Sequence, residues 1–238
     1  VNIVAPSTQQ TATSKSMTFD RPIRVYAKRI VDGIEGLVVD GTPADAFTIG
    51  IHHYPDIDFV VSGINAGDNT SIHSLLTSGT VAVCLEAAVS NKINGWAFSL
   101  DTASKYFFTP TTEHNLDDFK VAAKRAVSLI NKILISGGFP DDVSFFSVNF
   151  PNNLTETTPI RIARPMLTKY TNFPIERKDP RDTSYFWIWG DYVEPPLETD
   201  TYWVRTKKEI AITPYSIQSL QKIDEMAISR FKKLFNGQ

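Results

Sequence analysis

The chain has 238 residues, of which 42% are hydrophobic, 21% are charged and one is a cysteine. This is the composition of an ordinary globular protein, and it excludes disordered, fibrous and disulfide-framework classes. A formal net charge of −2 gives no electrostatic basis for binding a nucleic-acid duplex or an anionic membrane, and no apolar run reaches the roughly 18 residues of a membrane-spanning helix.

The first 40 residues predict short strands separated by a polar loop. Residues 1–6 read as a strand that ends at Pro6, and the chain opens in it with neither an initiator Met nor a signal peptide. Residues 7–16 are rich in hydroxyl groups and predict a loop. Strand patterns follow at 23–26 and 36–39.

A helix and a buried strand come next. Thr42 is a typical N-cap, with Pro43 at the first helical position and an acid at the third. The run Phe59–Val61 is continuously apolar, so we expect a strand that is buried on both faces, followed by a loop with glycines. Residues 78–90 then predict an apolar helix.

The middle of the chain continues the alternation of strands and helices. Residues 96–100 and 143–150 predict strands, and 117–134 has helical spacing before Gly137 and Gly138. This order is the signature of a doubly wound α/β sheet.

The residue pattern changes after Pro151. Prolines and aromatic residues surround two strand-like runs, 185–189 and 201–204, and a third strand pattern lies at 210–213. Residues 216–235 predict an amphipathic C-terminal helix. Such a region often serves subunit contacts, and an ordinary second layer of the same domain fits the pattern equally well.

Two loops carry the residue types that point to chemistry. In α/β sheets, ligands bind beyond the carboxyl ends of the strands, where loops 7–16 and 62–69 are expected. The second loop has glycines for close backbone approach, and Asn65 and Asn69 offer oxygens to a hard cation such as Mg²⁺. Ser-Gly-Thr at 78–80 presents hydroxyls and free N–H groups at a helix start, which suits an anion. Together these pieces predict a metal-plus-phosphate pocket, although each alone is more often an ordinary turn or cap.

The central part of the chain resembles a known family. Residues 55–69, Pro-Asp-Ile-Asp-Phe-Val-Val-Ser-Gly-Ile-Asn-Ala-Gly-Asp-Asn, followed by Ser-Gly-Thr-Val-Ala at 78–82, closely resemble the SurE family of metal-dependent nucleotidases and acid phosphatases. Outlying segments agree along nearly the whole chain, at 4–6, 14–18, 41–45, 97–100, 179–181 and 212–214.

The resemblance implies a Rossmann-like α/β core at 1–151 that hydrolyses nucleoside monophosphates or other phosphate monoesters with a divalent cation, Mg²⁺ or Mn²⁺. It implies that 152–238 form a peripheral β-rich excursion and a C-terminal helix used in oligomerisation, giving a homodimer or homotetramer with an exchanged C-terminal segment. Trp187, Trp189 and Trp203 could stack a nucleobase, and subunit packing is the interpretation we favour. We expect a cytoplasmic protein without a membrane partner, and a packed, unreactive Cys84.

The resemblance also implies the site residues. Asn65 matches one family metal ligand directly, and Thr11 falls on the position of a second, a serine. The remaining family ligands, two adjacent aspartates that follow the first strand, match nothing here and would lie before Val1, so no catalytic carboxylate is assigned. The phosphate oxygens would be held by Asn69, Ser78, Gly79 and Thr80, with Ser14 and Ser16 lining the pocket.

Two functional hypotheses follow. The first is a metal-dependent phosphomonoesterase of the SurE type. The second is a catalytically silent nucleotide- or phosphate-binding module, which keeps the anion site but lacks the metal carboxylates.

Overall fold

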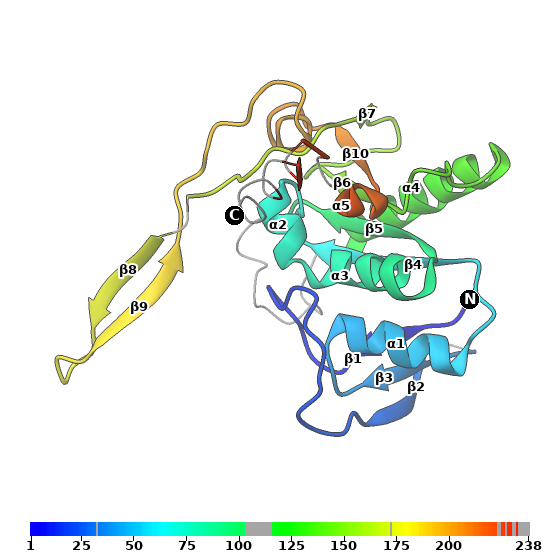
Figure 1. Ribbon diagram of the computed structural model, residues 1–238, viewed down its shortest axis with the longest axis horizontal. Coiled ribbons are helices and arrows are strands. Elements are labelled where there is room, and N and C mark those ends of the chain that lie inside the picture. The colour runs from blue at the N-terminus through cyan, green and yellow to red at the C-terminus, as the bar shows by residue number, and fades with distance from the viewer. Residues whose placement is uncertain are drawn as a thin grey trace.

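The protein is built around two sheets and a projecting hairpin, as the ribbon of the computed structural model shows (Figure 1). The structure describes residues 1–31, 33–102, 116–171, 173–222, 225–226, 228–229 and 232.

The central sheet has five strands in the order β4-β5-β6-β10-β7. The first three run parallel, β10 is antiparallel to β6, and β7 is parallel to β10. The strands are β4 (Phe59–Ala66), β5 (Asn94–Leu100), β6 (Phe145–Phe150), β7 (Ile160–Ile162) and β10 (Ile210–Tyr215). Strands from both sides of Pro151 therefore share one sheet, and a division of the chain at that residue stays a prediction.

A smaller sheet holds the N-terminal strands in the order β1-β3-β2. Its members are β1 (Val4–Pro6), β2 (Val25–Val31) and β3 (Ile34–Val39). Helix α1 (Pro43–His53) packs on β1 and β3 and begins with the expected cap: the Thr42 hydroxyl accepts from the Asp45 N–H, and the Asp45 carboxylate accepts from the Thr42 N–H.

Helices cover both faces of the central sheet, as expected for a doubly wound fold. Alternate residues of β5 divide between the two faces. Trp96, Phe98 and Leu100 belong to the core under α4 (Leu116–Ile135), whereas Ala97 packs with Val81 of α3 (Gly79–Glu86). Helix α2 (Ile72–Thr77) directly precedes α3, which continues as a π-helical turn, Ala87–Asn91, and α1 lies beside α3.

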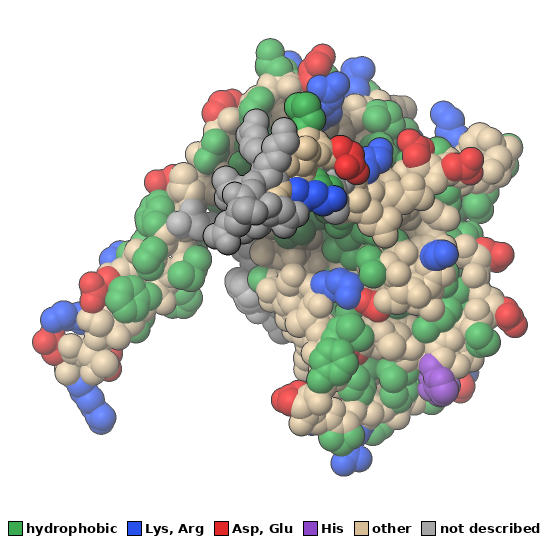
Figure 2. All heavy atoms as spheres, viewed as in Figure 1, with side chains coloured by type: hydrophobic (Ala, Val, Ile, Leu, Met, Phe, Trp, Pro, Cys, Tyr) green, Lys and Arg blue, Asp and Glu red, His purple; other side chains and the backbone are tan. Residues whose placement is uncertain are grey.

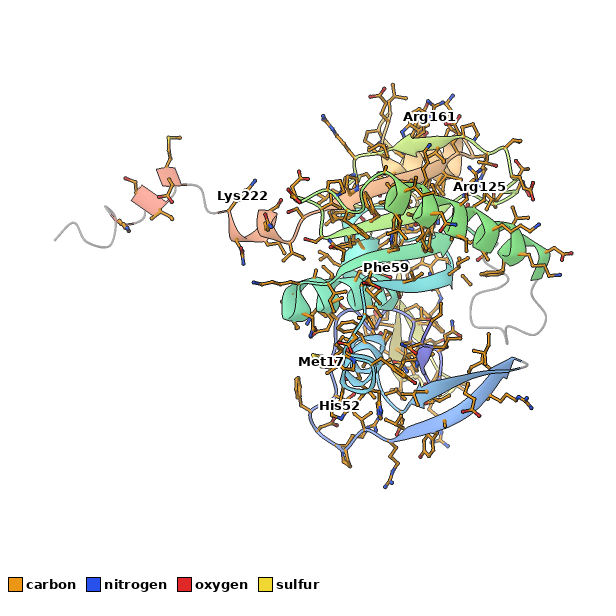
Figure 3. All side chains as sticks on the ribbon, turned by 90° about the vertical axis from the view of Figure 1, so that its right-hand side faces the viewer. Met17, His52, Phe59, Arg125, Arg161 and Lys222 are labelled. Atoms are coloured by element: carbon orange, nitrogen blue, oxygen red, sulfur yellow. The ribbon has the colours of Figure 1, made fainter. Side chains whose placement is uncertain are left out.

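Helix α4 is also tied to the segment before β7. Arg125 donates to the carbonyl oxygens of Glu156 and Thr158 at 2.7 and 2.8 Å, so its guanidinium bridges the helix and the loop (Figure 3). No helix in the described part of the chain combines the length and apolarity that crossing a bilayer requires.

A two-stranded arm projects away from the rest of the molecule. It consists of β8 (Phe173–Lys178) and β9 (Ser184–Trp189), paired antiparallel. Hydrophobic side chains line the middle of the arm and charged ones gather at its tip (Figure 2), and Trp187 and Trp189 are 63% and 62% exposed. Trp203, in contrast, packs within its own chain against Ala163 and Val204.

Three expectations about the elements need correction. The run 201–204 is not a strand: Tyr202–Val204 lie in a π-helical turn, Tyr202–Thr206, in which the Lys207 N–H donates to the Tyr202 carbonyl at 3.0 Å. Strand β4 is not buried on both faces, since Val61 is 47% exposed. The strand lies at the edge of its sheet, next to β5 only. The expected helix 216–235 is not continuous either.

At the C-terminus, α5 (Gln218–Gln221) ends at Lys222, whose backbone is extended with a ψ of 112°. Both lie at the side of the molecule, away from the sheets (Figure 3). Most of the expected helix beyond Lys222 falls outside the described residues.

Candidate functional site

The candidate site lies where β1 and β4 end. Loop 7–16 follows β1, and the chain turns out of β4 at Gly67, whose N–H donates to the Leu100 carbonyl at 2.8 Å. Gly63 is required for this path: it has a φ of +107°, and a Cβ there would lie 2.2 Å from the Phe98 carbonyl oxygen. The irregular register between Ser62 and Asn65 then carries Asn65 to the end of the strand.

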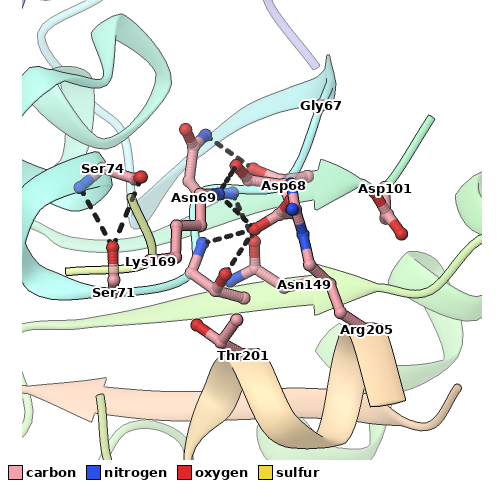
Figure 4. Close-up of polar contacts among 12 residues, drawn as sticks. Gly67, Asp68, Asn69, Ser71, Ser74, Asp101, Asn149, Lys169, Thr201 and Arg205 are labelled. Atoms are coloured by element: carbon pink, nitrogen blue, oxygen red, sulfur yellow. Dashed lines mark hydrogen bonds and ion pairs between the residues drawn. The ribbon is translucent and has the colours of Figure 1, made fainter. Parts of the chain in front are cut away.

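Asn65 and Asn69 are both oriented by hydrogen bonds. The Asn65 side chain donates its amide N–H to the Gly67 carbonyl at 2.7 Å, a bond that does not use Oδ1, the atom a cation would take. Asn69 receives support from two strands of the central sheet (Figure 4): its backbone N–H donates to Asn149 Oδ1 at 2.7 Å, and its side-chain amide donates to Ser99 Oγ at 2.8 Å.

The polar residues that hold Asn69 explain an oddity of the central sheet. Ser99 on β5 and Asn149 on β6 are almost fully buried, on strands that are mostly apolar. Buried polar groups are normally paired, and these pair with the site loop. Asn149 is fixed in turn by donating to Ser147 Oγ at 3.2 Å.

The Ser-Gly-Thr segment opens helix α3 as expected. The Ser78 hydroxyl caps the helix by accepting the Val81 N–H at 3.2 Å. Gly79 is packed so closely that a Cβ would lie 2.9 Å from a Pro43 ring carbon and 3.3 Å from Thr13 Oγ1. Only glycine fits here, and loop 7–16 therefore lies directly on this helix start, which also carries Thr80.

Loop 7–16 is held against α2 and α3 from several sides. Ser14 donates its N–H to the Thr77 carbonyl at 3.0 Å and its hydroxyl to the Leu76 carbonyl at 2.6 Å. Lys15 forms an ion pair with Glu86 of α3. The carbonyl of Ser16 accepts the Thr42 hydroxyl at 2.7 Å.

The structure thus brings Ser14 and the helix start 78–80 together, and Asn69 together with the ends of β5 and β6. The hydroxyl of Ser14 is engaged with Leu76, and that of Ser78 with the helix cap. Thr11 is exposed, and its Oγ1 accepts from the Gln9 side chain at 3.0 Å.

A buried charge cluster beside Asn69 was missed by the sequence reasoning. The Asp68 carboxylate is bound by Lys169 at 2.5 Å through Oδ1 and by Arg205 at 2.7 Å through Oδ2. Burial alone would raise the pKa of Asp68, but the charges and hydrogen bonds of these cations hold it well below its usual range. The position of Asp68 inside the motif 62–69 was the available signal, since its partners lie 101 and 137 residues away.

The described residues do not by themselves make a divalent-metal site. Asn65 and Thr11 offer neutral oxygens only, and the carboxylate of Asp68 is already neutralised by two cations. Among the described residues, no three His, Cys, Asp or Glu side chains are grouped to hold a metal ion. Divalent cations of this class need carboxylate ligands, so the set seen here is incomplete.

A further expectation concerns Cys84. Cys84 is fully buried in the core between α3 and the sheet, and burial raises the pKa of its thiol well above the usual range. This confirms a packed thiol and not a nucleophile. His52 and His53 are exposed in the last turn of α1.

Comparison with known proteins decides the family. The family model described as "Survival protein SurE" matches residues 1–172. The chain belongs to the SurE family. Among curated SurE relatives, a protein of Hyperthermus butylicus named "5'-nucleotidase SurE" is 35% identical over 95% of this chain and 79% of its own length. A protein of Methanosarcina acetivorans with the same name is 35% identical over 97% of this chain and 87% of its own length.

The fold agrees with a solved SurE structure. The crystal structure of the SurE protein from Aquifex aeolicus matches with a TM-score of 0.73, covering 98% of this chain and 88% of that one, at 24% sequence identity. This similarity confirms the α/β fold with its parallel central strands.

Proposed function

We propose that this SurE-family chain is a nucleotidase that hydrolyses the phosphate ester of nucleoside monophosphates. Two observations support the proposal: loop 7–16 lies directly on the helix start 78–80, and Asn69 is held at the ends of β5 and β6. The names of the curated relatives support the same reaction class.

The chain's own residues would bind and orient the phosphate. The N-terminus of α3 would present backbone N–H groups and the positive end of the helix dipole to an anion, and Gly79 lets loop 7–16 pack closely on this helix start. Asn69 would hold a phosphate oxygen, because its backbone and amide are fixed before substrate arrives. Thr80, Ser14 and Ser16 complete the polar wall.

We further propose that the reaction depends on a divalent cation, Mg²⁺ or Mn²⁺, with Asn65 and Thr11 as neutral ligands. The missing carboxylates would come from a strand between the two sheets. Among the described residues β1 pairs with β3 alone and β4 with β5 alone, while α1 and α3 pack side by side above them. A strand in this position would end at the same edge as Asn65.

Phosphate release from nucleoside monophosphates tests these proposals. The activity should be abolished by EDTA and restored by Mg²⁺ or Mn²⁺. Ligand binding by calorimetry without turnover, unaffected by the chelator, would instead identify a silent binding module. The intact mass of the protein from its natural source tests the strand directly, because a mass equal to that of the 238-residue chain leaves no segment to supply it.

Self-association is a separate proposal. The exposed aromatic residues of the arm, Phe186, Trp187 and Trp189, and the C-terminal segment that leaves the body at α5 support a homodimer or homotetramer. Light scattering should give a multiple of the chain mass, and the substitution of Trp187 and Trp189 by Ser should reduce it. A monomeric native protein would contradict this proposal.

A cytoplasmic location is likewise proposed. It is supported by the lone, buried Cys84, which indicates no dependence on disulfides. Fractionation of native cells with an antibody to the protein tests it.

A further inference from the structure

Asp68 lies inside the site loop but is bound from outside it. It directly precedes Asn69, and both of its carboxylate oxygens are occupied (Figure 4). Oδ1 accepts from Lys169 Nζ and from the Thr70 hydroxyl, and Oδ2 accepts from Arg205 Nε at 3.0 Å and Nη2 at 2.7 Å. Lys169 Nζ also donates to the Asp68 backbone carbonyl at 2.9 Å, so that the main chain is fixed as well as the side chain.

Lys169 lies at the base of the arm, and Arg205, in the turn Tyr202–Thr206, packs against that base. Tyr170, next to Lys169, pairs with Tyr192 in an isolated bridge that closes the arm just before β8 and just after β9. Arg205 donates to the Tyr170 hydroxyl at 2.6 Å, and its guanidinium lies 5.3 Å from the ring centre of Tyr170 and 5.5 Å from that of Tyr192. Asp68 is thus connected to both strands of the arm through one guanidinium.

A second, parallel connection runs through Asp200. Its buried carboxylate accepts the Ser71 N–H at 2.7 Å and the Met166 N–H at 3.1 Å. The segment that leads into the arm is therefore joined to the site loop at two points, through Asp68 and through Ser71. These two residues flank Asn69 and Thr70 in the sequence.

The position of Asn69 depends on Asp68, because the two residues are adjacent in the chain. Asn69 has two bonds to the sheet, to Asn149 and Ser99, and its chain neighbour is locked to the arm base. A change in the arm base that moves Arg205 or Lys169 must displace Asp68 or leave its buried charge unpaired, which is strongly unfavourable.

We propose that Asp68 is a positioning residue that sets Asn69 for substrate and couples the base of the β8–β9 arm to the active site. The role in catalysis rests on the proposed function, whereas the coupling does not. Asp68→Asn keeps the shape but removes the charge that both cations bind. Misplacing a substrate-binding group in this way typically costs about 10- to 100-fold in rate.

The test combines a kinetic cycle with hydrogen exchange. Asp68→Asn should lower kcat/KM for a nucleoside monophosphate about 10- to 100-fold, and most of this loss should disappear when Asn69 is already Ala, because both changes remove one interaction. Exchange of the amides in segment 67–73 should increase in Asp68→Asn. Additive losses in the cycle, or a kcat/KM within twofold of wild type with unchanged exchange, would overturn the proposal.

Two further variants keep the test decisive. Tyr170→Phe removes only the hydroxyl that Arg205 binds, and it should increase exchange of segment 67–73 by a smaller factor in a protein that folds normally. Glu209→Gln is the control, because its carboxylate also binds an arginine, Arg161 of the edge strand β7, at 2.5 Å. If the wild type shows no turnover, the proposed function fails, and the exchange of segment 67–73 in Tyr170→Phe still decides the coupling: unchanged exchange rejects it.

Discussion

The hydroxyl of Ser14 donates a hydrogen bond of 2.6 Å to the carbonyl oxygen of Leu76, in the last turn of α2. The bond ties the loop after β1 to the segment that leads into α3. Since that segment supplies the proposed phosphate-binding helix start, the two halves of the pocket are joined before any ligand arrives.

The first prediction concerns the neighbouring ion pair between Lys15 and Glu86. Glu86 is buried on α3, and although burial opposes ionisation, Lys15 and Ser90 hold the pKa of its carboxyl below the ordinary value of 4.5. Glu86→Gln should lower the free energy of unfolding at pH 7 by about 1 kcal/mol, as expected for loss of a charged hydrogen bond. A depressed pKa contributes stability above the ordinary value, so the difference should shrink as the pH falls below 4.5.

Urea denaturation at pH 7 and pH 3 measures this difference. Glu156→Gln is the control, because its pair with Lys124 is exposed on both sides. We expect an effect within about 0.5 kcal/mol for the control. Equal losses in both variants would show that the Lys15–Glu86 pair has no special role.

Asn69 provides the second prediction. Asn69→Asp places a negative charge beside the phosphate that Asn69 is proposed to bind, so kcat/KM should fall by at least about 10²- to 10³-fold, the effect of losing one oriented donor. Steady-state phosphate release measures it, and Asn131→Asp on the exposed face of α4 is the matched control. An Asn69→Asp enzyme with wild-type kinetics would remove Asn69 from the site.

Asp101 gives a prediction with the opposite dependence on pH. Burial and the nearby charge of Asp68 raise the pKa of its carboxyl above the ordinary value of 3.8. A raised pKa means that the ionised form opposes folding, so Asp101→Asn should raise the melting temperature at pH 7. The gain should disappear below pH 3.8, where the carboxyl is protonated in both states. A lower melting temperature at pH 7 would mean that the interaction with Lys208 outweighs burial.

Cys84 should be unreactive in the native protein. Its thiol is fully buried, and burial raises its pKa, so the reactive thiolate is scarce. A chromogenic disulfide reagent should label no thiol in the native state and one per chain in guanidinium. Rapid stoichiometric labelling of the native protein would contradict the packing described here.

Local sequence signals predicted the elements that local interactions determine. The Thr42–Asp45 capping box lies within four residues, and the apolar runs of β5 and β6 are buried as expected. The turn at 202–206 was mistaken for a strand because aromatic and β-branched residues favour strands, whereas in the structure the Trp203 N–H donates to the Thr199 carbonyl and the segment is helical. The exposure of Val61 depends on what lies beside β4, which its own sequence does not reveal.

The residues of the candidate site likewise fall into those that short sequence motifs predict and those that only the tertiary fold brings together. Asn65, Asn69 and residues 78–80 were predicted because they belong to two short motifs, 55–69 and 78–82, that are recognisable in the sequence. Lys169 and Arg205 were not, since only the tertiary fold brings them to Asp68. The buried Ser99 and Asn149 were hidden in apolar strands, and the polar residue in an apolar run was the signal that was overlooked.

The most direct test of the central claim is phosphate release from a nucleoside monophosphate by the native protein, measured beside Asn69→Asp. The proposed function predicts release that EDTA abolishes, that Mg²⁺ or Mn²⁺ restores, and that Asn69→Asp largely loses. Absence of phosphate release by the metal-loaded protein, or equal release by the variant, would contradict it.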